Sequence, residues 1–336
     1  MGSMTKTLAI AIPTWGRPAE IGARLRELVP QLCGDVGLWV FENGRTEPVA
    51  AQMEEWPEVK YCPSEENRGV YRNVMRCFEE VDAEWVWILG DDDSVHPDAV
   101  SRLLAICRES DAAAVVFRSF SPSVGDRVEV SSLEELARTV SLSEALFLTG
   151  TVWRREVLRR ETQSFMESVY TMSAQLVVLC RTVAAGRESV LVVGDSLVTP
   201  KTSGHRWSRL EYTQRSPALL DHLTTSADRQ TAARWLAPNW WWAAGDSVRE
   251  VDSVQTLGLW REAIWRGLRI MKANGVRNLR MTAGNWLMGL GRCLVGMPAG
   301  EHFLFAASLP PSIGLRVLKG LRYVLGKRGI ARLLAI

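Results

Sequence analysis

Residues 85–93 read Trp-Val-Trp-Ile-Leu-Gly-Asp-Asp-Asp, and this stretch decides the fold class. Five consecutive apolar residues that end at a glycine are typical of a strand buried on both faces. Three adjacent aspartates repel one another, and their charge is costly unless a cation lies among them. Carboxylate oxygens are the ligands that Mg²⁺ and Mn²⁺ prefer. We therefore predict a buried strand with a divalent-metal site at its carboxyl end. An acidic cap on the following helix is the alternative.

Apolar segments of the same kind recur on both sides of this strand. Further predicted strands span residues 8–12, 37–41, 59–61, 113–117, 145–152 and 190–193, and predicted helices span 18–29, 70–81, 97–108 and 163–185. Strands that alternate with helices form a mainly parallel sheet with helices on both faces, a Rossmann-like α/β fold. Ligands bind such sheets beyond the carboxyl ends of the strands, so the polar residues that follow these strands should meet at one edge. From about residue 216 the pattern is helical, which predicts a C-terminal helical extension.

The composition excludes several classes of protein. The chain has 336 residues, of which 47% are hydrophobic and 23% charged, so it is neither disordered nor fibrous. Six cysteines without a CxxC pair argue against a disulfide framework or a zinc site and favour a reducing compartment. There is no P-loop motif, no GxGxxG that opens a helix, no HExxH and no GxSxG, which argues against the enzyme classes that depend on them.

The net charge of +2 hides an asymmetry between two parts of the chain. Residues 255–336 carry a net charge of +11 and residues 1–254 a net charge of −9. Within residues 312–336, apolar residues recur at helical spacing with Arg and Lys between them, a pattern that favours a lipid surface over nucleic acid. Two interpretations stay open: a helix packed on the core with a solvated basic face, or contact with an anionic membrane. No run of 18 apolar residues predicts a span, so the expected location is cytoplasmic, with peripheral contact at the inner face of the membrane as the open alternative.

Four blocks in the first 100 residues resemble one family. They are Leu8–Arg17 (LAIAIPTWGR), Glu42-Asn43-Gly44, Asn67-Arg68-Gly69 followed by Arg72-Asn73, and Trp87–Asp93 followed by Pro97. In this order and spacing they resemble the family 2 glycosyltransferases, which have the GT-A fold. The triple aspartate resembles bacterial transferases of the abequosyl, O-antigen or natural-product type. Residues 148–158 resemble the beginning of the half of that fold that binds the acceptor.

This resemblance implies an enzyme of class EC 2.4. It would transfer a hexosyl, N-acetylhexosaminyl or deoxyhexosyl group from a nucleotide-diphosphate sugar, with a UDP-sugar the first choice. The acceptor would be a hydroxyl of a glycan, a lipid-linked glycan or a small natural product. Residues 5–205 would form the GT-A domain that binds the donor and carries out catalysis. Residues 206–336 would form a helical, Trp-rich, basic region that serves the acceptor, an oligomer contact or a membrane surface.

The resemblance also implies individual site residues. The nucleotide-sugar pocket would be formed by Pro13, Thr14, Trp15, Arg17, Glu42, Asn43, Asn67, Gly69, Arg72, Asn73, Gly90, Asp91 and Asp92. The divalent cation, Mg²⁺ or Mn²⁺, would be held by Asp93 first, together with Asp91 and His205.

The chain departs from the family pattern where inverting members carry a general base. The acidic pair expected there falls on Ala174 and Gln175, and neither side chain can accept a proton. Either the base has moved, with Glu167 and Asp195 as the nearest candidates, or the leaving phosphate accepts the proton in a retaining reaction. The stereochemical outcome stays open.

Two other functions remain alternatives, and a cluster of tryptophans has two interpretations. A nucleotidyltransferase would need a glycine-rich basic loop after the first strand, where residues 12–17 hold one glycine. The missing acidic pair at 174–175 would also suit a sugar-nucleotide binding protein without catalysis. The tryptophans at 235 and 240–242 fit core or oligomer packing, or an acceptor platform.

Overall fold

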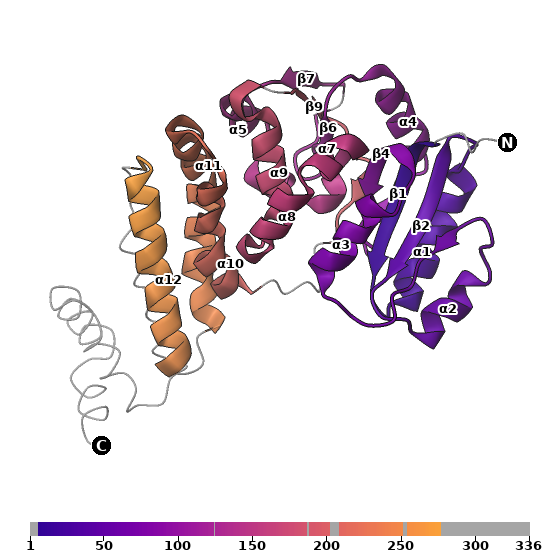
Figure 1. Ribbon diagram of the computed structural model, residues 1–336, viewed down its shortest axis with the longest axis horizontal. Coiled ribbons are helices and arrows are strands. Elements are labelled where there is room, and N and C mark those ends of the chain that lie inside the picture. Colours follow the sequence, from indigo (N-terminus) through magenta and orange to yellow (C-terminus); the bar gives the residue numbers. More distant parts are fainter. Residues whose placement is uncertain (1–5, 124, 187, 202–207, 251–253, 277–336) are drawn as a thin grey trace. The chain divides into compact units, whose positions relative to one another are not determined.

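The computed structural model describes residues 6–123, 125–186, 188–201, 208–250 and 254–276 (Figure 1). The chain divides into two compact units, which are described separately. The first comprises Met1–His205 and Asp221–Ala232, and the second comprises Arg206–Leu220 and Ala233–Ile336. His205 and the basic segment 312–336 lie outside the described residues, so the predictions made for them stay predictions. None of the described helices combines the length and the hydropathy that crossing a bilayer requires.

The first unit is built on an eight-stranded mixed sheet with the strand order β3-β2-β1-β4-β8-β6-β9-β7. Neighbours pair in parallel from β3 to β4 and between β6 and β9, whereas β8 and β7 run antiparallel to their neighbours. The strands are β1 (Lys6–Thr14), β2 (Val36–Glu42), β3 (Lys60–Tyr61), β4 (Ala83–Ile88), β6 (Ala114–Phe117), β7 (Arg127–Val130), β8 (Thr151–Arg154) and β9 (Val190–Val193). A two-stranded sheet pairs β5 (Ser94–Val95) with β10 (Val198–Thr199).

Helices cover both faces of the sheet, as Figure 1 shows. They are α1 (Pro18–Leu28), α2 (Glu47–Met53), α3 (Val70–Glu79), α4 (Ala99–Glu109), α5 (Leu133–Thr139), α6 (Leu142–Leu146), α7 (Arg155–Arg160), α8 (Thr162–Ser168) and α9 (Ala174–Val183). Ile10 and Ile12 of β1 share one core with Leu25 of α1 and Leu103 of α4. Helix α3 packs against β1, β2 and β4. Both faces of the central strands are therefore buried, which confirms the α/β fold class predicted from their apolar runs.

Three sequence predictions differ from the structure in this unit. Residues 145–152 were expected to form one strand, but α6 ends at Leu146, a 3₁₀ turn spans Leu148–Gly150 and β8 begins only at Thr151. A capping box at Ser141, with Glu144 as its acidic partner, stabilises α6 and keeps this segment helical. The predicted helix 163–185 is interrupted at Met172, which has φ +59°. Finally, α2, β5, β7, α5 and β10 were not predicted, because short elements carry little periodicity.

The second unit is helical. It contains α10 (Arg209–Arg215), the greater part of α11 (Ser226–Asp246) and α12 (Val254–Ala273). Trp240 is fully buried and donates its indole N–H to the carbonyl of Thr213 at 2.8 Å. Trp242 is 63% exposed, with the guanidinium of Arg209 4.9 Å from its ring centroid. The tryptophan cluster therefore supplies a core side chain at one position and a surface side chain at another.

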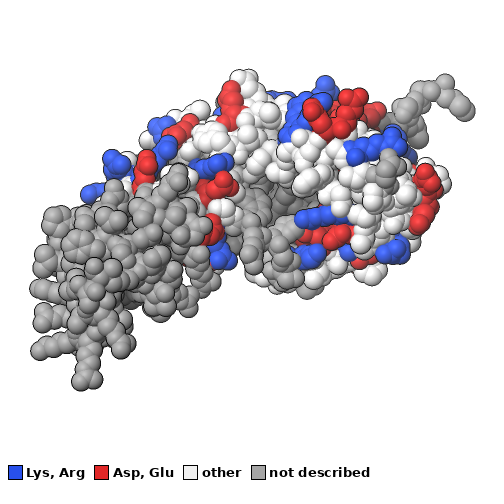
Figure 2. All heavy atoms as spheres, turned by 90° about the horizontal axis from the view of Figure 1, so that it is seen from below, with Lys and Arg blue, Asp and Glu red and all other residues white. Residues whose placement is uncertain are grey.

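Charged side chains of both signs lie on the surface of the described residues. On the face that Figure 2 shows, basic and acidic side chains of the described residues lie interspersed. Several of them form ion pairs, such as Arg155 with Asp82 at 2.9 Å and Arg154 with Glu84 at 2.6 Å. Exposed pairs of this kind contribute little to stability.

Candidate active site

The strand register brings the predicted polar residues to one edge of the sheet. Thr14, the last residue of β1, pairs with Glu42, the last residue of β2. On the other side of β1, Ala11 pairs with Ile88 at the end of β4. The loop of Asp91, Asp92 and Asp93, which we call the aspartate loop, therefore follows β4 at the same edge. Parallel strands end side by side, and the expectation that these residues converge is therefore met.

Asp91 contacts residues at the end of β1 and directly after it. Its carboxylate accepts a hydrogen bond from the hydroxyl of Thr14 at 2.7 Å and one from the guanidinium of Arg17 at 2.9 Å. The same guanidinium lies 3.5 Å from the carboxylate of Asp92. Arg17 therefore neutralises part of the charge of two aspartates. This lowers the repulsion that a further anionic group, such as a diphosphate, would meet on approaching them. Trp15, between these residues, is 61% exposed.

Asp93 has other partners, which lie far from it in the sequence. It accepts a hydrogen bond from the hydroxyl of Thr149 at 2.6 Å and one from the backbone N–H of Lys201 at 3.1 Å. The Thr149 hydroxyl in turn accepts a hydrogen bond from the N–H of Gly90 at 2.9 Å. A Cβ atom at Gly90 would lie 2.7 Å from the Asp93 carboxylate, so only glycine fits here without moving that carboxylate. Sequence analysis did not find Thr149, which it placed in the middle of a strand.

Burial makes this loop electrostatically costly. Desolvation raises the pKa of Asp91, against the opposing effects of the Thr14 hydrogen bond and the Arg17 charge. Desolvation also raises the pKa of Asp93, against the hydrogen bonds from Thr149 and Lys201. The folded state thus favours the protonated forms, and ionising both carboxylates at neutral pH costs folding free energy. A bound cation would offset that cost.

The donor set suits a cation that shares its ligands with a substrate. The described residues contain no group of three or more His, Cys, Asp and Glu side chains arranged around one point. Mg²⁺ and Mn²⁺ in phosphate-transfer sites typically take one or two carboxylates and complete their shell with water and phosphate oxygens. Asp91 and Asp93 are oxygen donors on one short loop, and each carboxylate oxygen has lone pairs beyond those that its hydrogen bonds use. These residues therefore fit a divalent ion bound together with a diphosphate.

The Glu42-Asn43-Gly44 turn is rigid. The Glu42 carboxylate is fully buried and accepts hydrogen bonds from the N–H and hydroxyl of Thr46, at 3.1 and 2.5 Å, and from the Tyr61 hydroxyl. Gly44 has φ +91°, and a Cβ atom there would lie 2.9 Å from the backbone nitrogen of Asn67. In this structure the Glu42 side chain holds the turn, so its predicted contact with the nucleoside stays a prediction.

The side chain of Asn43 connects this turn to the 67–69 loop. Its amide donates to Asn67 at 2.7 Å, and its oxygen accepts from the N–H of Arg68 at 2.8 Å. The oxygen of Asn67 also accepts from the N–H of Gly69, directly before α3. Three predicted pocket residues from two separate blocks thus contact one another, and they form one wall beside the ends of β1 and β2.

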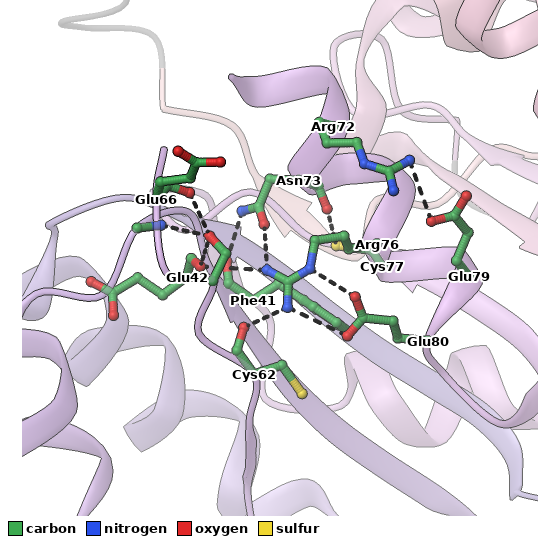
Figure 3. Close-up of polar contacts among 12 residues, drawn as sticks. Phe41, Glu42, Cys62, Glu66, Arg72, Asn73, Arg76, Cys77, Glu79 and Glu80 are labelled. Atoms are coloured by element: carbon green, nitrogen blue, oxygen red, sulfur yellow. Dashed lines mark hydrogen bonds and ion pairs between the residues drawn. The ribbon is translucent and has the colours of Figure 1, made fainter. Parts of the chain in front are cut away.

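Helix α3 holds the strand ends together through two side chains (Figure 3). Buried Asn73 donates to the carbonyl of Phe41 at 2.7 Å and to that of Thr14 at 3.4 Å. The guanidinium of Arg76 donates to the carbonyl of Cys62 at 3.0 Å and, at 3.5 Å, to that of Glu42. Arg76 was missed by sequence analysis, although it lies one helical turn after Asn73 on the same face.

Arg72 occupies a different position from the one that its sequence block suggests. Its side chain is 42% exposed and lies 3.6 Å from Glu79 of the same helix. Figure 3 shows it directed away from Glu42 and Arg76. Its approach to a diphosphate stays a prediction, and in the structure it forms a surface ion pair.

Replacing Arg76 by Leu should lower the free energy of unfolding by about 2–4 kcal/mol. The change removes the donor to two strand-end carbonyls and leaves the carboxylate of Glu80, 2.7 Å from Arg76, without this partner. Arg72→Leu on the same helix is the matched control and should cost less than about 1 kcal/mol. Urea unfolding followed by fluorescence measures both. Equal losses in the two variants would contradict the assigned difference.

The segment that should carry the catalytic base has a different role in the structure. Gln175 donates its amide to the carbonyl of Leu146 at 2.8 Å, an interaction that an ionised Glu could not make. Glu167 is exposed on α8 and accepts a hydrogen bond from Gln163 at 2.8 Å. Asp195 follows β9 at the carboxyl edge and lies 3.4 Å from Arg102. Neither of these contacts involves the aspartate loop, so both residues stay predictions as the base.

The fold and the acidic loop at its edge define a GT-A-type α/β domain. Residues 9–169 match the family model described as Glycosyl transferase family 2. Residues 9–169 are therefore similar to the family 2 glycosyltransferases, the family that the four sequence blocks resemble.

Solved structures support the same fold. The crystal structure of S. aureus TarS residues 1–349 has a TM-score of 0.52 at 13% identity and covers 80% of this chain and 90% of that chain. Its complex with UDP-GlcNAc gives the same values. A longer S. aureus TarS structure has a TM-score of 0.54 at 14% identity and covers 80% of this chain and 54% of that chain. Among curated proteins no match was found. At such identities the similarity establishes the fold alone.

Proposed function

We propose that this protein transfers a sugar from a nucleotide-diphosphate donor to a hydroxyl acceptor, and that it uses Mg²⁺ or Mn²⁺. The observation that carries the proposal is the loop of Asp91–Asp93 at the carboxyl edge of a domain similar to the family 2 glycosyltransferases, with Arg17 between two of its carboxylates. A UDP-sugar is the first choice of donor, because TarS, which has this fold, is described in complex with UDP and with UDP-GlcNAc.

Each part of the donor would contact a different group of residues in this site. The 42–44 turn and the 67–69 loop offer backbone and amide groups for a nucleoside beside β1 and β2. The Arg17 guanidinium, 3.5 Å from the Asp92 carboxylate, would contact the diphosphate. Asp93, with Asp91, would hold the divalent ion, which would neutralise charge on the leaving phosphate. Thr149 and Lys201 hold the Asp93 carboxylate in one orientation for this purpose.

The fate of the acceptor proton divides two versions of this proposal. In the first, Glu167 or Asp195 removes the proton and the reaction inverts the anomeric centre. In the second, an oxygen of the departing diphosphate takes the proton on the same face and the configuration is retained. Neither Ala174 nor Gln175 has a side chain that can act as the base, and the Gln175 amide instead donates to the carbonyl of Leu146.

A thermal-shift and turnover experiment tests the proposal. Purified protein with Mn²⁺ is mixed with UDP, CDP, GDP and dTDP and their sugars, and the melting temperature is recorded. We expect UDP with Mn²⁺ to raise the melting temperature, and neither alone to do so fully, since ligands that bind only the folded state stabilise it. Release of nucleoside diphosphate on addition of acceptors supports transfer. In a parallel reaction with UTP and a sugar 1-phosphate, release of pyrophosphate would instead support nucleotidyl transfer. Binding without turnover in either reaction would support a sugar-nucleotide binding protein.

A further inference from the structure

A pair of phenylalanines lies at the same sheet edge as the aspartate loop. Phe120 follows β6 and is 48% exposed. Its ring contacts Phe147 edge to face, with centroids 5.2 Å apart. We call these two residues the aromatic pair.

The register of the sheet brings the aromatic pair to the same edge as the aspartate loop. Strand β8 lies between β4 and β6, and Val116 near the end of β6 pairs with Thr151 at the beginning of β8. The residues after β6 and before β8 therefore emerge at the edge where β4 ends. Thr149 lies two residues after Phe147 and donates to Asp93 at 2.6 Å. One short segment thus carries both an aromatic ring and the partner of the proposed metal ligand.

Partly buried hydrogen bonds hold the segments that carry the aromatic pair. Glu144 is only 1% exposed, and its carboxylate accepts a hydrogen bond from the hydroxyl of Ser121, next to Phe120, at 2.7 Å. The Gln175 amide holds the carbonyl of Leu146, next to Phe147. A Cβ atom at Gly150 would lie 2.9 Å from the Phe147 ring, so that ring packs closely on the glycine. These contacts hold the residues next to Phe120 and Phe147 in place.

We propose that the aromatic pair contacts an apolar group, aryl or alkyl, that the acceptor carries close to its reacting hydroxyl. This inference rests on the proposed glycosyl transfer and names the class of acceptor. A phenylalanine offers no hydrogen bond, so the ligand group that covers it gains most when it is apolar itself. Thr149, which lies two residues after Phe147, contacts Asp93, and this connection supports a place for that group near the reacting hydroxyl.

The test compares glucosides that differ only in the group attached to the sugar. Methyl, phenyl and hexyl β-D-glucoside are titrated against the full chain, with and without UDP and Mn²⁺, and binding is followed by ligand-observed NMR. We expect the phenyl and hexyl compounds to bind wild-type protein about tenfold more tightly than the methyl compound. Phe120→Ala should remove that preference. Phe120→Leu should keep it for the hexyl compound, because leucine retains apolar surface, and a loss confined to the phenyl compound would identify an aryl group.

Val128→Ala is the matched control, because Val128 on β7 is 45% exposed and lies outside the aromatic pair. Equal affinity of the three glucosides for wild-type protein, or an equal loss in Phe120→Ala and Val128→Ala, would overturn the inference. The titrations without UDP keep the two proposals separate. Failure of UDP to bind wild-type protein would count against glycosyl transfer, whereas normal UDP binding without a preference among the glucosides would count against the aromatic pair alone.

Discussion

Asp93→Asn should reduce the rate of sugar transfer by about a thousandfold. The substitution keeps the size of the side chain but removes the negative charge that a divalent cation needs. An amide can accept from only one of the two donors that face Asp93, the Thr149 hydroxyl and the Lys201 N–H. Steady-state release of UDP from a UDP-sugar at a series of Mn²⁺ concentrations measures the effect.

The stability of the same variant separates loss of chemistry from loss of fold. Because burial raises the pKa of Asp93, removing its charge relieves a desolvation cost while one hydrogen bond is lost. We expect the free energy of unfolding to change by less than about 2 kcal/mol. Asp82→Asn, at an exposed carboxylate paired with Arg155, is the control and should leave the rate unchanged. A wild-type rate in Asp93→Asn would remove Asp93 from the site.

Thr149→Val should lower the transfer rate by about 10- to 100-fold and the free energy of unfolding by about 1–3 kcal/mol. Valine has nearly the same shape, but it neither donates to Asp93 nor accepts from the N–H of Gly90. The N–H of Gly90 then loses its partner, and the Asp93 carboxylate is free to rotate away from its working orientation. Kinetics and urea unfolding on the same preparation measure the two effects.

Thr182→Val provides a closely matched control for this prediction. Thr182 is also buried, at 1% exposure, and its hydroxyl donates to the carbonyl of Val178 within α9. That carbonyl is an ordinary helix acceptor, so the loss of the hydroxyl leaves no donor without a partner. We expect unchanged kinetics and a smaller loss of stability. If Thr149→Val behaves like Thr182→Val in both measurements, Thr149 does not position Asp93.

Local patterns explain which parts of the fold could be predicted. The long apolar runs of β1, β2 and β4 identify buried strands by themselves, and each prediction for them is confirmed within a few residues. The segment 145–152 misled because Leu146 to Val152 is apolar enough for a strand, whereas the capping box at Ser141 begins a short helix before it. For short segments such as this one, contacts with neighbouring parts of the fold determine which secondary structure forms.

The prediction that an acidic loop follows a buried strand needed only the local sequence. Three adjacent aspartates directly after an apolar run can be read from residues 85–93 alone. The local sequence also determined the chemistry that such a loop suits. The groups that contact each carboxylate, in contrast, follow from how distant segments pack together. The partners of Asp93 lie 56 and 108 residues further along the chain, at Thr149 and Lys201. They reach it because β8 lies beside β4 and because β10 pairs with β5, and strand order is set by the packing of the whole sheet rather than by any one segment.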